Sequence, residues 1–119
     1  MSTTATPITV TRDLAQPMAH EVQIRDHHFT VDGSVAEGGS DSGPDPHDLY
    51  DAAVSACKAL TLVWYARRKG LPLTDVKVSM ARDASEERHG VYRLHATLHL
   101  AGDLSDAQRQ ELLAIADEE

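Results

Sequence analysis

The side chain best suited to covalent chemistry in this chain is the thiol of Cys57, its single cysteine. A thiolate is a nucleophile, and oxidation converts it to a sulfenic acid. One cysteine cannot form an internal disulfide, and it cannot supply a zinc cage or an iron–sulfur cluster made of several thiolates. Buried cysteines also serve as small hydrophobic residues. Cys57 is therefore either a nucleophile that a nearby cation activates or a packing residue.

The seven histidines are the other potential metal ligands. His95 and His99 fall on one face of a predicted strand, where they would lie about 13 Å apart. His27 and His28 are adjacent and would point to opposite faces of an extended chain. These spacings do not match the ligand sets of known metal centres, so we expect no metal site.

Two further patterns are weaker candidates for a site. Residues 33–46 (GSVAEGGSDSGPDP) lead into a helix, as phosphate-binding loops do, but they lack the Gly-Lys-Ser/Thr ending. We expect a flexible connection there. A serine triad could combine Ser55, His47 and Asp51, but a serine inside a helix without a tight turn is rarely a nucleophile.

Cys57 lies in the middle of a predicted helix of about 24 residues. Asp45 and Pro46 are typical of a helix start, and the cations at 67–69 followed by Gly70 are typical of a helix end. Lys58 is the only charged residue between Asp51 and Arg67. A helix that is apolar on nearly all sides is expected to be buried on most of them, so it needs a sheet and a further partner to cover it.

The remaining elements predict an α+β fold in a single domain over residues 1–119. Alternation of polar and apolar residues predicts short antiparallel strands before the loop and a β-hairpin after the long helix. Ser105 and Gln108 form a capping-box pattern that opens a second, shorter helix. The predicted strands cover 8–11, 20–25, 29–32, 75–80 and 91–100.

Composition excludes several classes of function. The chain has 11 Lys and Arg against 19 Asp and Glu, a net charge of −8, so it is poorly suited to binding nucleic acid. It contains no run of about 18 apolar residues, so we expect no membrane span. Its N-terminal residues do not have the pattern of a signal peptide, and a lone thiol suits a reducing compartment, so we expect a cytoplasmic protein.

Residues 37–78 (EGGSDSGPDPHDLYDAAVSACKALTLVWYARRKGLPLTDVKV) resemble the OsmC/Ohr family of peroxiredoxin-like proteins. The resemblance rests on the Gly-Gly and Gly-Pro loop, the apolar helix with its central cysteine, and the strand that follows. It implies an α+β fold that forms an intertwined homodimer, in which two long central helices pack against antiparallel sheets. The second copy would then supply the missing cover for the long helix.

The resemblance also implies thiol-dependent reduction of organic hydroperoxides, without a metal or organic cofactor. Cys57 stands at the position of the peroxidatic cysteine. An arginine from the N-terminal part of the family's fold stabilises the thiolate, and Arg25 is the first candidate for it, with Arg12 second. His47 and Asp48 are expected to line the substrate site across the dimer interface.

This sequence departs from the family at two places. His47 stands ten residues before Cys57, where the family's peroxidases carry a glutamate, and no second, resolving cysteine follows. We therefore expect either a chain shortened at its C-terminus or resolution by an external thiol. The alternative function is a non-catalytic relative that binds an apolar small molecule at the dimer interface, with Cys57 as a lining residue.

Overall fold

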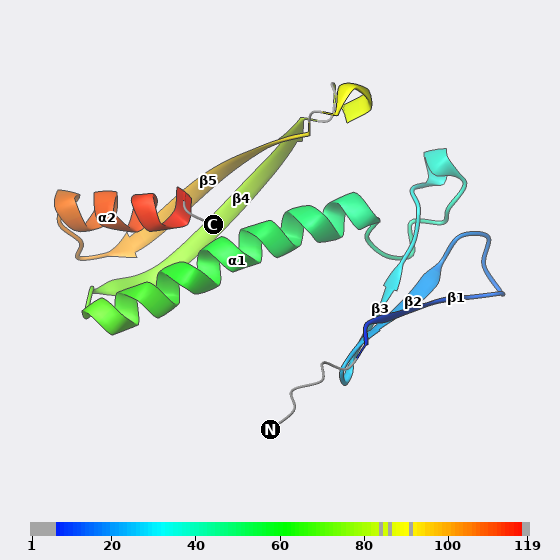
Figure 1. Cartoon of the computed structure of the whole chain (residues 1–119), viewed down its shortest axis with the longest axis horizontal. Coiled ribbons are helices and arrows are strands. Elements are labelled where there is room, and N and C mark those ends of the chain that lie inside the picture. The colour runs from blue at the N-terminus through cyan, green and yellow to red at the C-terminus, as the bar shows by residue number, and fades with distance from the viewer. Residues whose placement is uncertain (1–6, 84, 86, 91, 118–119) are drawn as a thin grey trace. The chain divides into compact units, whose positions relative to one another are not determined.

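The described residues form five strands and two α-helices, which follow one another in the order that Figure 1 shows. The structure is a computed structural model that describes residues 7–83, 85, 87–90 and 92–117. It divides into two compact units, residues 1–49 and residues 50–119. The predicted α+β class is confirmed, with two antiparallel sheets. The prediction of a single domain stays a prediction.

The first unit contains a three-stranded antiparallel sheet of β1 (Thr9–Arg12), β2 (His20–Ile24) and β3 (His27–Val31). Val10 pairs with Val22, and Val22 pairs with Phe29, so these three side chains share one face of the sheet. Val22 is buried, whereas Val10 remains 61% exposed. The sheet therefore has one apolar face that its own unit covers only in part.

The glycine-rich loop after β3 is folded around the carboxylate of Asp32, which is buried. One carboxylate oxygen accepts a hydrogen bond from the Gly33 N–H, and the other accepts from the N–H groups of Ser40 and Ser42 and from the Ser42 hydroxyl. A Cβ at Gly39 would lie 2.1 Å from the Gly33 carbonyl oxygen. The prediction of a flexible connection was wrong, because an internal anion organises this loop.

These hydrogen bonds hold the pKa of the Asp32 carboxyl below its usual 3.8, with the Ser42 hydroxyl as the largest cause. The stabilisation that Asp32 provides is therefore complete above about pH 4 and is lost as the pH falls through the lowered pKa. We expect the Ser40 and Ser42 amides to exchange about tenfold faster in Asp32→Asn. Hydrogen exchange by NMR tests this, with Asp41→Asn in the same loop as the control. Unchanged exchange in Asp32→Asn would contradict the role of the carboxylate.

Helix α1 (Pro46–Lys69) begins and ends where the sequence predicts. Asp45 and Asp48 cap its start reciprocally: the Asp48 N–H donates to Asp45 Oδ1 at 2.8 Å, and the Asp45 N–H donates to Asp48 Oδ2 at 3.1 Å. At the other end Gly70 has φ +68°, and the Leu71 N–H donates to the carbonyl of Ala66. That pattern is a Schellman motif, which requires a left-handed residue and favours glycine.

The second unit packs α1 against a long hairpin, β4 (Leu73–Asp83) and β5 (Arg93–Gly102), and against α2 (Asp106–Asp117). Its core is formed by four fully or nearly buried residues, Leu62, Ala66, Leu112 and Ala116. The predicted capping box is confirmed, because Ser105 and Gln108 exchange two hydrogen bonds. The predicted hairpin is confirmed as well, but β4 extends beyond the predicted residues 75–80 at both ends.

The expectation that α1 is buried on most sides was wrong for the single chain. Only Asp51, Leu62 and Ala66 of this helix are buried, and Leu60 is 70% exposed. The hairpin and α2 contact one side of the helix, and its apolar residues on the other side face solvent. In the part of the chain that the structure describes, no helix combines the length and the apolar character that crossing a membrane requires.

Candidate functional site

Cys57 is exposed on the solvent side of α1. Ala53, Ala56, Leu60 and Trp64 recur along the same side of the helix at steps of three and four residues, and all are exposed. We call these four residues and Cys57 the Cys57 stripe. The stripe places a thiol in the middle of an apolar helical surface that this chain leaves uncovered.

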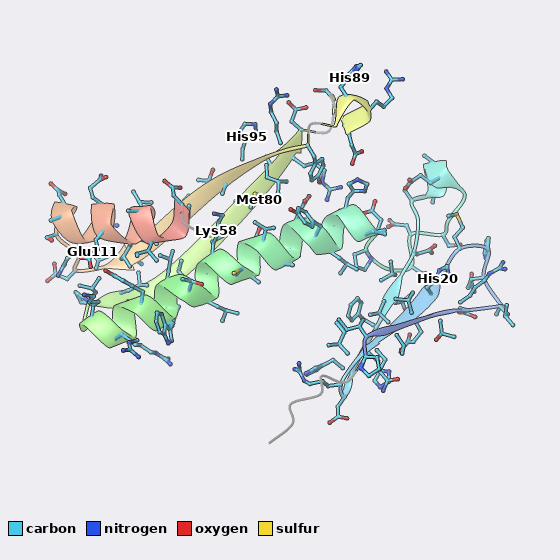
Figure 2. The ribbon with its side chains drawn as sticks, viewed as in Figure 1. His20, Lys58, Met80, His89, His95 and Glu111 are labelled. Atoms are coloured by element: carbon cyan, nitrogen blue, oxygen red, sulfur yellow. The ribbon has the colours of Figure 1, made fainter. Side chains whose placement is uncertain are left out.

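A thiol in the middle of a helix gains little from the helix dipole, so its ionisation depends on a cation from another element. Lys58 does not supply that cation. Its ammonium donates a hydrogen bond of 2.8 Å to the carbonyl oxygen of Ala116, in the last turn of α2 (Figure 2). In addition, the Tyr65 hydroxyl donates a hydrogen bond to the carboxylate of Glu111. Two side chains of α1 therefore form hydrogen bonds with α2.

Arg25, the predicted thiolate stabiliser, lies in the turn between β2 and β3 with φ +54°. Its carbonyl oxygen accepts a hydrogen bond from Gln23 Nε2 at 3.2 Å. Arg12, the second candidate, ends β1, and its guanidinium donates to the Pro17 carbonyl oxygen. Both arginines belong to the first unit and Cys57 belongs to the second, so their approach to the sulfur stays a prediction.

His47 and Asp48 lie in the first turn of α1. Asp48 is occupied in capping that helix through the backbone N–H of Asp45. His47 is exposed and lines a cavity of the first unit. The role of these two residues in binding a substrate therefore stays a prediction, and Asp48 also has a structural role that the sequence indicated.

The structure also contains a polar cluster of Asp51, Arg82 and Tyr92 that the sequence patterns did not reveal, in which Asp51 is buried. Arg82 Nε lies 2.7 Å from Asp51 Oδ2, and the Tyr92 hydroxyl donates to both carboxylate oxygens, at 2.8 and 3.0 Å. Desolvation and the contact with Asp51 raise the pKa of Tyr92. The cluster joins the end of β4 and the residue before β5 to α1 at Asp51, six residues before Cys57.

A longer strand would have revealed Arg82. β4 extends to Asp83, so the period of two puts Arg82 on the same face as Val76, Val78 and Met80, although Arg82 itself is exposed. The strand predicted from the sequence ends at residue 80 and so leaves Arg82 outside it. An arginine at an inward position of a strand predicts a buried acidic partner.

The serine triad finds no support in the geometry. The Ser55 hydroxyl donates to the backbone carbonyl of Asp51 at 2.8 Å, whereas the Asp51 carboxylate is taken by Arg82 and Tyr92. Across the described residues, no three His, Cys, Asp or Glu side chains are grouped so that they could hold a metal ion. The thiol is the nucleophile that this arrangement leaves accessible.

Comparison with solved structures finds the same fold in bacterial proteins of low sequence identity. An OsmC-like protein from Mycoplasma pneumoniae matches with a TM-score of 0.77 and 12% identity, over 99% of this chain and 84% of that one. An organic hydroperoxide resistance protein OsmC from Legionella pneumophila has a TM-score of 0.69 and 19% identity, over 99% and 85%. The organic hydroperoxide resistance protein OhrB of Bacillus subtilis matches with a TM-score of 0.58 and 21% identity, over 94% of this chain and 82% of that one.

The sequence model of the OsmC-like protein family matches residues 39–119, which include α1, the hairpin and α2. No curated protein matches the sequence. The match covers more than half of the chain, so the chain belongs to the OsmC-like family. The resemblance seen in residues 37–78 is thereby confirmed.

Proposed function

We propose that this protein reduces organic hydroperoxides with Cys57 as its nucleophile. The observation that carries the proposal is the accessible thiol on the apolar Cys57 stripe, in a chain of the OsmC-like family. Two of the matched structures belong to proteins named for organic hydroperoxide resistance. An apolar surface around the sulfur suits the hydrocarbon part of such a substrate.

The reaction follows from thiol chemistry. The Cys57 thiolate attacks the terminal peroxide oxygen, the O–O bond breaks, and the alkoxide leaves and takes up a proton to become an alcohol. Sulfur is oxidised to a sulfenic acid. An external thiol then condenses with it, releasing water and forming a mixed disulfide, and a second thiol restores Cys57. Arg25, or Arg12 in its place, would hold the thiolate ionised before the attack.

We further infer that two copies assemble through the apolar surfaces that one chain leaves uncovered. These surfaces are the Cys57 stripe of α1 and the apolar face of the three-stranded sheet, where Ile8 and Val10 are more than 60% exposed. Apolar area of this extent favours association. His47 and Asp48 would then lie at the interface that holds the substrate.

Charge introduced into the stripe tests the assembly. Leu60→Asp is expected to convert the dimer to a monomer, because an unpaired carboxylate would be buried at the interface. Sedimentation velocity measures the mass in solution. Leu14→Asp is the matched control, since Leu14 is 85% exposed and lies outside the stripe. A monomeric unsubstituted protein, or a Leu60→Asp variant that remains dimeric, would contradict the proposed interface.

The chemistry is tested by mixing the reduced protein with one equivalent of cumene hydroperoxide. Mass spectrometry should find one added oxygen at Cys57, and cumyl alcohol should appear in equal amount. The pH dependence of thiol alkylation should give a pKa for Cys57 below the value of about 8.5 that a free cysteine has. Retention of the peroxide with no added oxygen would instead favour a non-catalytic relative that binds an apolar molecule.

A further inference from the structure

The first unit contains a cavity of about 330 Å³, and His47 is one of its lining residues. Met18, Val31 and Pro46 supply apolar walls, and His20, Glu37 and Asp45 supply polar groups. All of the lining residues precede residue 50, so this unit forms the cavity by itself. Its volume falls within the range of small-molecule pockets.

The carboxylates at this cavity are hydrogen-bond acceptors, and two histidines, His20 and His47, also line it. His20 Nδ1 lies 2.7 Å from the carbonyl oxygen of Met18 (His20 is labelled in Figure 2). A carbonyl oxygen only accepts, so the His20 Nδ1–H is the donor of this hydrogen bond. Glu37 accepts through Oε1 from Ser34, and Asp45 accepts through Oδ1 from the Asp48 N–H. Each of these two carboxylates has a second oxygen to offer.

The first unit carries a net negative charge, like the carboxylates at the cavity. Residues 1–49 contain eight Asp and Glu against two arginines, whereas the rest of the chain is nearly balanced. The whole first unit therefore attracts cations. A ligand that matches acceptors, negative charge and apolar walls carries N–H donors, a positive charge and a hydrocarbon body.

We propose that this cavity binds a small organic cation, an alkyl- or arylammonium whose ammonium group lies between Glu37 and Asp45 and whose hydrocarbon part lies against Met18 and Val31. The loop that supplies Glu37 is held in place by the buried Asp32, so the site is formed before binding. The ammonium site proposed here does not include Cys57, and His47, which the proposed function places near the peroxide substrate, lines the same cavity.

Benzylamine, benzyl alcohol and benzoate test the proposal because they share one ring and differ in charge. Titration of the full chain is followed by NMR at the methyl group of Met18, with Met80 of the second unit as an internal reference. We expect saturable shifts at Met18 with benzylammonium, about tenfold weaker binding of benzyl alcohol, and no binding of benzoate.

A double substitution, Glu37→Gln with Asp45→Asn, removes both charges while glutamine and asparagine can still accept the local hydrogen bonds. It should weaken benzylammonium binding about tenfold or more. Glu21→Gln with Asp26→Asn removes the same charge elsewhere in this unit and should change binding less than about twofold. Glu37→Gln alone provides the test if the double variant is unstable. Equal binding of the amine and the alcohol, binding of benzoate, or absence of saturation would overturn the proposal.

Discussion

Cys57→Ser is expected to lower hydroperoxide consumption by at least about a thousandfold, to the rate of buffer with reductant. A serine hydroxyl remains protonated and cannot form a sulfenic acid, so neither the attack on oxygen nor the later exchange with thiol can occur. Loss of cumene hydroperoxide over time measures the rate. Mass spectrometry should show no added oxygen in the variant.

Ser55→Ala is the matched control for this prediction. Ser55 lies on the same helix, and its hydroxyl only donates to the carbonyl of Asp51. The variant should retain activity within about twofold, because a single half-buried hydroxyl contributes little to the free energy of unfolding. Residual turnover in Cys57→Ser comparable to that of the unsubstituted protein would refute a role for the thiol as nucleophile.

The largest effect on stability is expected at the polar cluster of Asp51, Arg82 and Tyr92. Asp51→Ala would leave the guanidinium and the phenol without their shared acceptor, in a position where the Asp51 side chain is only 10% exposed. We expect a loss of about 3 kcal/mol in the free energy of unfolding. This loss is at the lower end of the range expected when one partner of a buried ion pair is removed, because the Arg82 side chain is 35% exposed.

Chemical denaturation of three variants separates the contributions. Tyr92→Phe removes one donor and should cost about 1 kcal/mol. Arg82→Met should cost more, because it leaves a buried carboxylate without its cation. Combining Asp51→Ala with Arg82→Met should cost less than the sum of the two single changes, because the pair is lost only once. Additive costs would show that the two side chains are not energetically coupled.

Much of the secondary structure is determined by local sequence signals. Asp45 and Pro46 set the start of α1 and Gly70 sets its end, and Ser105 with Gln108 starts α2. Each signal acts within one helical turn, through a cap or a left-handed backbone position. The alternation in Val76 and Val78 likewise determined which face of β4 is covered. Family membership could be read from residues 37–78, since loop, helix and strand are contiguous there.

The tertiary structure decided the contacts that span many residues. Asp32 meets Ser42 ten positions later, Tyr92 meets Asp51 across 41 positions, and Lys58 meets Ala116 across 58. No local pattern encodes these partners, because a carboxylate or ammonium in the sequence satisfies its charge with whichever donor or acceptor the fold brings near it. The same reason explains why α1, apolar along its length, exposes the Cys57 stripe in a single chain: composition shows that a surface needs cover, but packing decides which side receives it.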